Sequence, residues 1–189
     1  MQNLAEREAR MTTGWKLYWV LVAVTLAVYL AMLIWTLPAI SAAAGGLAPF
    51  DLRPTGYSFE DAQAFLVALP SDSVKFYQNT QHRLDAIFPA LVGAVLAIGL
   101  WQLSRAWSVK VRLLLVMFPL AGAVSDYLEN SAVAKMLVAG GDLITPEMVE
   151  LSSNWTVLKS VANSFSMISL LGFLLVVLSR AMKNRGVEK

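Results

Sequence analysis

The chain has 189 residues, of which 57% are hydrophobic and 15% are charged, and it contains no cysteine. Soluble globular domains carry about 25% charged residues, so this composition excludes an ordinary water-soluble enzyme, and the lack of cysteine excludes disulfides, thiolate metal sites and thiol catalysis. The formal net charge is only +2 and no basic cluster stands apart from the apolar stretches, so nucleic acid is not an expected partner.

Four apolar stretches of about 20 residues dominate the sequence, and about 20 helical residues cross a hydrocarbon core of about 30 Å. They predict an all-α integral membrane protein, folded as a four-transmembrane-helix bundle. The spans leave no room for a separate soluble domain, so residues 1–189 are expected to form a single membrane domain. A long first outer loop, carrying a short amphipathic helix, is expected between the first two spans.

The first span is predicted over residues 17–40. Trp15 and Trp35 stand near its two ends, where interfacial aromatic belts are expected. A cleaved signal peptide is the alternative, because the small residues at 41–44 follow an apolar run that basic residues precede. That run is about twice as long as the 7 to 15 residues of a signal-peptide core, which favours an uncleaved span.

The connection over residues 41–83 is predicted to contain a helix at 59–69. Ser58 precedes this segment as a capping side chain, apolar residues then recur at helical spacing, and Pro70 ends the run. We expect an amphipathic helix lying across the bundle mouth or in the headgroup layer. A second helix start at Ser71 is expected to continue into the second span.

The remaining spans are predicted over residues 84–103, 112–138 and 155–179. The third is unusual, because its uncharged part, residues 113–125, covers only about 20 Å of the roughly 30 Å required. It must therefore carry the acidic residues that follow into the outer part of the membrane.

The basic residues predict the orientation of the spans. The loop between the second and third spans holds Arg105, Lys110 and Arg112 without an acid, and the tail at 180–189 is also mainly basic. Short basic flanks stay on the cytoplasmic side. We therefore expect a multi-pass protein of the cell membrane (inner or plasma membrane), with the N-terminus and the C-terminus cytoplasmic and the long first loop outside.

Charged side chains at hydrocarbon depth cost about 2.5 to 3.5 kcal/mol each on insertion scales, so their positions are informative. Counted from the inner boundary, seven polar residues of the last three spans lie at about 20 to 30 Å, in the outer third. Helical spacing places those of each span on one face, as for Gln78, His82 and Asp85 in the second span. The seven residues are His82, Asp85, Asp126, Glu129, Asn130, Lys159 and Asn163.

These stripes predict a polar pocket that binds a small amphiphile, a lipid headgroup or an ion. Asp85, Asp126 and Glu129 are the candidate proton donors or acceptors, and Lys159 supplies the countercharge. An unneutralised excess of acids is untenable at low dielectric, so we expect bound protons, a bound cation or access of outer water. The candidate binding residues are His82, Tyr127, Asn130, Lys159 and Asn163.

Whether the pocket catalyses a reaction stays open, and acid–base chemistry is the only mechanism that these residues support well. No Walker loop, Gly-x-Ser-x-Gly or His-Glu-x-x-His motif is present. No cofactor is predicted, and a single histidine makes a metal a minority interpretation. The alternative function is a structural or assembly subunit whose buried charges fix helix pairing. Membrane lipid is an expected partner, and a homo-oligomer or a membrane-complex partner is possible under either hypothesis.

Overall fold

The computed structural model describes residues 2–187, and over that range the chain contains helices and loops but no strand. Four helical segments are long and apolar enough to cross a membrane: Thr13–Ala43, Ser71–Leu103, Val109–Ala139 and Pro146–Arg180. This confirms the prediction of an all-helical chain with four candidate membrane-spanning helices, which is compatible with a multi-pass membrane protein. The last two residues of the predicted cytoplasmic tail, Glu188 and Lys189, lie outside the described range.

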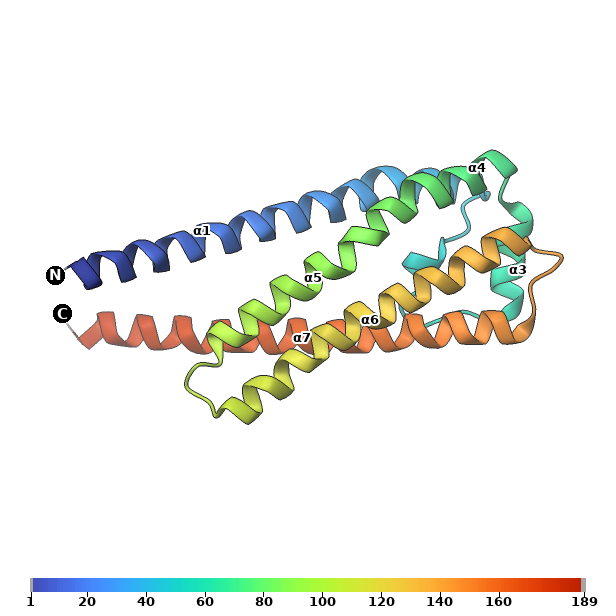
Figure 1. The fold of residues 1–189 in the computed structure, drawn as a ribbon. Helices are drawn as coiled ribbons and strands as arrows, with labels where there is room; N and C mark the ends of the chain where they lie inside the picture. Colours follow the sequence, from blue (N-terminus) through green and yellow to red (C-terminus); the bar gives the residue numbers. More distant parts are fainter. Residues whose placement is uncertain (1, 188–189) are drawn as a thin grey trace.

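The helices form an elongated bundle with both chain ends at one end of it (Figure 1). We call this end the terminal end. The opposite end is covered by the connection between the first two long helices, residues 44–70, and we call it the capped end. All four helices extend beyond the predicted spans, because backbone hydrogen bonding continues into polar residues that the apolar pattern does not mark.

The first long helix consists of α1 (Gln2–Ala31), one π-helical turn η1 (Met32–Thr36) and α2 (Leu37–Ala43). Pro38 lies in the first turn of α2. Because proline has no N–H to donate, the regular hydrogen-bond ladder is interrupted there, next to the wider π turn.

The second long helix starts at Ser71, as predicted, and runs without a break to Leu103. It consists of α4 (Ser71–Phe76), a second π-helical turn η3 (Tyr77–Gln81) and α5 (His82–Leu103). The π turn has one extra residue, which rotates the side chains before it relative to those after it.

The last two long helices are α6 (Val109–Ala139) and α7 (Pro146–Val187). α6 packs along both α5 and α7, whereas α1 lies mainly against α5. Small residues allow the close approach of α5 and α6: a Cβ atom added to Gly93 would lie 3.2 Å from the Cβ atom of Ala123.

The connection at the capped end contains a short 3₁₀ turn η2 (Phe50–Leu52) and the helix α3 (Phe59–Ala68). Ser58 and Asp61 form a capping box at the start of α3. The rings of Phe50 and Phe65 pack 5.0 Å apart in a core that also includes Tyr77. The connection is therefore an apolar cap packed on the helix ends; its position relative to a headgroup layer stays a prediction.

Candidate functional site

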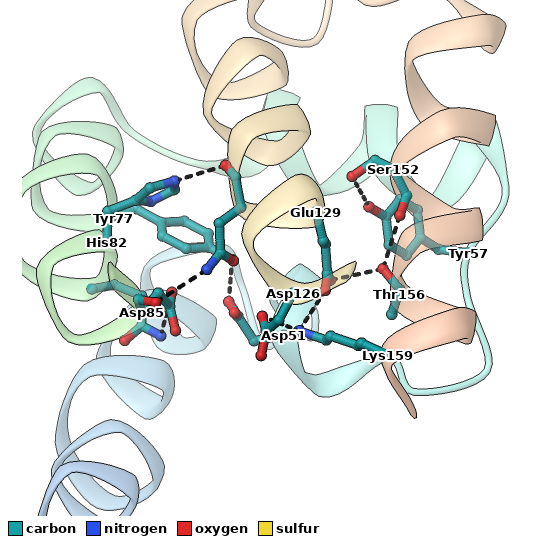
Figure 2. A network of polar contacts seen from close by, with 12 residues as sticks. Asp51, Tyr57, Tyr77, His82, Asp85, Asp126, Glu129, Ser152, Thr156 and Lys159 are labelled. Carbon is teal, nitrogen blue, oxygen red and sulfur yellow. Dashed lines mark hydrogen bonds and ion pairs between the residues drawn. The ribbon is translucent and has the colours of Figure 1, made fainter. Parts of the chain in front are cut away.

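An ion pair between the last two helices lies at the centre of the site (Figure 2). The Nζ atom of Lys159 on α7 is 3.1 Å from Oδ1 of Asp126 on α6 and also contacts the carboxylate of Glu129, one helical turn further along α6. Glu129 is only 1% exposed. The structure therefore brings these three predicted site residues together, because a spacing of three residues places both acids on one face of α6.

Glu129 has a second partner on α7. The hydroxyl of Thr156 is 2.7 Å from Oε1 of Glu129 and 3.1 Å from the carbonyl oxygen of Ser152. Thr156 precedes Lys159 by three residues, so both side chains lie on the face of α7 that meets α6. Glu129 is thus held by an ammonium and a hydroxyl from the same helix.

Asp85 lies on α5 and is 4% exposed. Its Oδ2 atom accepts a hydrogen bond of 3.0 Å from Nε2 of Gln81, whose own Oε1 atom accepts one from the hydroxyl of Thr36. Within the part of the chain that the structure describes, Asp85 makes no ion pair. It is therefore a buried acid held by an amide, without a cationic partner.

His82 and Asn130 connect α5 to α6 next to Asp85, but through backbone atoms. The Nε2 atom of His82 lies 3.0 Å from the carbonyl oxygen of Asn130, and Nδ2 of Asn130 donates over 3.3 Å to the carbonyl oxygen of Asp85. Within the described part of the chain, neither side chain forms a hydrogen bond with a carboxylate. The Nδ1 atom of His82 is buried without a hydrogen-bond partner.

The structure places the other two predicted residues away from the acids. Tyr127 is 42% exposed and donates to the carbonyl oxygen of Ala86, 3.1 Å away. Asn163 packs its side-chain oxygen against Gly122, and that oxygen is buried without a hydrogen-bond partner. Tyr127 follows Asp126 directly, so it points about 100° away around the helix.

The sequence interpretation missed a fourth acid, Asp51 in η2. The hydroxyl of Tyr77 donates a hydrogen bond to Oδ2 of Asp51, and this carboxyl lies near the acids of α5 and α6 and near Lys159 (Figure 2). Asp51 lies between Phe50 and Leu52 in a loop. Its apolar neighbours are only a weak sign that it is buried. The segment is too short for a periodic pattern to predict which way its side chain points.

We call Asp51, Asp85, Asp126 and Glu129, together with Lys159, the acid cluster. Lys159 pairs with Asp126 and Glu129, whereas Asp85 and Asp51 lie nearby and accept hydrogen bonds from Gln81 and Tyr77 (Figure 2). Over residues 2–187, no three or more histidine and acidic side chains come together in a way that could hold a metal ion.

A chain of hydrogen bonds connects the acid cluster with a cavity at the capped end. Tyr57 donates from its hydroxyl to Oγ of Ser152 over 2.7 Å, and the backbone carbonyl oxygen of the same residue lies 3.1 Å from the hydroxyl of Thr156, the partner of Glu129. Tyr57 also lines a cavity of about 280 Å³ between the start of α3 and the start of α7. Burial raises the pKa of Tyr57 to about 12, so its phenol keeps its proton at neutral pH and can donate it in this bond.

No family model matches this chain, and neither a curated protein nor a solved structure matches it. The function is therefore inferred from the geometry and the chemistry of the site.

Proposed function

We propose that this protein is a multi-pass protein of the cell membrane that binds a cationic ligand at the acid cluster. The ligand is a small cation or the positively charged headgroup of an amphiphile, and the acids exchange protons as it binds. In this proposal the capped end faces the outside, and both termini are cytoplasmic because the loop before α6 is basic. The observation that carries the proposal is that Lys159 pairs with Asp126 and Glu129, while Asp85 and Asp51 lie in the same cluster with only a neutral amide and a phenol as hydrogen-bond partners among the described residues.

The excess of acids over bases supports a cationic ligand. A buried charge without a partner costs several kcal/mol, and Lys159 already contacts both Asp126 and Glu129. Over residues 2–187, Asp85 accepts a hydrogen bond from the amide of Gln81 and Asp51 accepts one from the phenol of Tyr77, and neither forms an ion pair. Protons or a bound cation would remove the remaining charge, and Asp85 is the acid most suited to direct contact with the ligand.

The cavity beside Tyr57 supports access from the capped end. It has a volume of about 280 Å³ and polar lining groups that include Ser58, Glu150 and Asn154. A headgroup entering there would face Glu150, and the polar contacts of Tyr57, Ser152 and Thr156 lead from this cavity to Glu129.

The proposal is tested by measuring the binding of tetraphenylphosphonium and dodecyltrimethylammonium to the purified protein in an uncharged detergent. Asp85→Asn keeps the shape of the side chain but removes its charge, so we expect affinity to fall at least about tenfold, or about 1.4 kcal/mol. The matched control is Asp72→Asn, because the side chain of Asp72 is 92% exposed on α4. Equal affinity in wild type, Asp85→Asn and Asp72→Asn would refute a site at the acid cluster.

The second candidate function is that of a structural or assembly subunit, and the double contact of Lys159 favours it. For a binding site, Asp126→Asn and Glu129→Gln should abolish binding and change the free energy of unfolding by about 1 kcal/mol or less. A purely structural cluster should lose about 3 kcal/mol or more. If all such variants failed to fold or to accumulate in the membrane, the structural function would replace the binding function.

A further inference from the structure

A larger cavity lies at the terminal end of the bundle, far from the acid cluster. It has a volume of about 470 Å³ and is lined by α1, α5 and α7. It occurs where α1 lies against α5 but makes little contact with α7. Its volume is within the range of about 300 to 1,000 Å³ that is usual for small-molecule sites.

Gly99 explains how the cavity is built. A Cβ atom at this position would lie 2.7 Å from Cδ1 of Leu170 and 2.8 Å from the hydroxyl oxygen of Tyr18. The glycine therefore lets side chains from α7 and α1 meet over the backbone of α5. Tyr18 donates there to the carbonyl oxygen of Val95 over 3.4 Å. The cavity is thus formed by defined contacts among three helices.

The lining of the cavity is apolar along its length and basic at one end. Val22 and Ile98 contribute aliphatic side chains, whereas Arg105 lies at the end of α5. Arg105 is exposed and donates to Oε1 of Gln102, a second polar residue of the lining. Arg105 is the basic residue of the lining, and the surrounding segment 101–112 contains three basic residues and no acid, so no acid of this segment neutralises the charge at the rim.

Aromatic residues lie beside this basic end. Trp15 and Trp19 of α1 line the cavity and are 49% and 59% exposed. Tryptophan is enriched at the level of lipid headgroups, because its ring has an apolar body and a polar N–H. The apolar part of the cavity matches an acyl chain, and its end at Trp15, Trp19 and Arg105 matches a phosphate headgroup.

We propose that this cavity is a binding site for one anionic phospholipid, with an acyl chain between α1, α5 and α7 and the phosphate at Arg105. The charge of the rim favours an anionic headgroup over a zwitterionic one, since basic residues near the membrane surface contribute about 1 kcal/mol each toward anionic lipids. The site is independent of the acid cluster and lies at the opposite end of the bundle.

The experiment is native mass spectrometry of the full chain, purified in an uncharged detergent and titrated with palmitoyl-oleoyl phosphatidylglycerol or the matching phosphatidylcholine. Wild type should retain one phosphatidylglycerol at least about tenfold more tightly than phosphatidylcholine. Val22→Trp fills the cavity and should remove this binding. Val20→Trp adds the same ring at a 57% exposed position of α1 outside the lining and should retain it.

Arg105→Gln tests the headgroup contact and is placed at an exposed position, so it should fold normally. It should bring the two affinities to within about twofold of each other while one lipid still binds. Three results would each overturn the site: equal retention of the two lipids by wild type, equal loss in Val22→Trp and Val20→Trp, or a stable lipid-free dimer that forms an intermolecular disulfide in the variant Ile98→Cys. Circular dichroism and thermal melting show whether Val22→Trp has folded. If it has not, the comparison of the two lipids in Arg105→Gln tests the site.

Discussion

The capped end and the terminal end of the bundle are held together by different interactions. At the capped end, helices α6 and α7 are joined by the pairs of Lys159 with Asp126 and Glu129, and the ring core around Phe65 covers them. At the terminal end, a cavity of about 470 Å³ lies between α1 and α7, and α1 packs on α5 through apolar side chains and a hydrogen bond of 3.4 Å from Tyr18 to the carbonyl oxygen of Val95.

This difference shows where the sequence specifies helix pairing. Lipid tails are as apolar as leucine, so apolar contact alone gives little preference for one helix neighbour over another. Buried polar pairs give that preference at the capped end, whereas the terminal end can leave space that a ligand fills. The following three predictions test this contrast, starting with the largest effect.

Lys159→Met should produce the largest loss of stability, about 3 to 5 kcal/mol, because it leaves two buried acids without their cation. The triple variant with Asp126→Asn and Glu129→Gln should recover most of this loss, since no unpaired charge remains. Chemical unfolding of the purified protein at pH 8 measures both. The control is Lys135→Met at an exposed position of α6, for which we expect a change within about 0.5 kcal/mol. If Lys159→Met were as mild as the control, the ion pair would not hold the capped end.

Tyr57→Phe should cost about 1 kcal/mol at neutral pH, because the hydroxyl of Ser152 loses its donor. Burial raises the pKa of Tyr57 from 10.0 to about 12, so the folded state keeps a proton that the unfolded state loses. Its contribution to stability is therefore complete below pH 10 and is lost as the pH rises toward 12.

Unfolding measured between pH 9 and pH 12 should show this alkaline loss in wild type and less of it in Tyr57→Phe. Tyr29→Phe, at an exposed position of α1, is the matched control and should behave like wild type. An identical alkaline profile in all three proteins would contradict the buried position of Tyr57.

Asp61→Ala should have the smallest effect, about 0.5 to 1 kcal/mol, because it removes half of the capping box of α3. Hydrogen bonds from the backbone and side chain of Ser58 lower the pKa of Asp61 below 3.8. This contribution is thus present above pH 3.8 and is lost as the pH falls through the lower folded value.

Hydrogen exchange of α3 at pH 7 and pH 3 should show faster opening in Asp61→Ala at pH 7 only. Asp142→Ala, at an exposed position of the loop before α7, should leave α3 unchanged. Equal exchange in Asp61→Ala and wild type at pH 7 would show that the cap does not depend on this box.

Much of the fold and the centre of the acid cluster could be predicted from the sequence. The apolar lengths predicted four helices, and the spacing of Asp126, Glu129 and Lys159 placed these groups on facing helix sides, where the structure brings them together. This prediction works because an α-helix converts sequence spacing directly into direction.

The buried face of the second long helix and the position of Asp51 could not be predicted from the sequence, because both depend on irregular backbone. A regular helix predicted a stripe of Gln78, His82 and Asp85, whereas the buried residues are Tyr77, Gln81 and Asp85. The π turn η3 causes this shift, and no sequence signal announces it. Asp51 was missed for a related reason, since its direction is set by a loop.

The π turn η3 also determines how the residues before it are rotated about the helix axis relative to α5. Deleting one residue from Tyr77–Gln81 would restore regular α-helical winding and rotate everything before it by about 100° relative to α5. The phenol of Tyr77 would point away from Asp51, and the packing of Tyr77 against Phe65 of α3 would be lost. The extra residue in this turn therefore sets the angle at which α3 and the rest of the cap pack against the long helices.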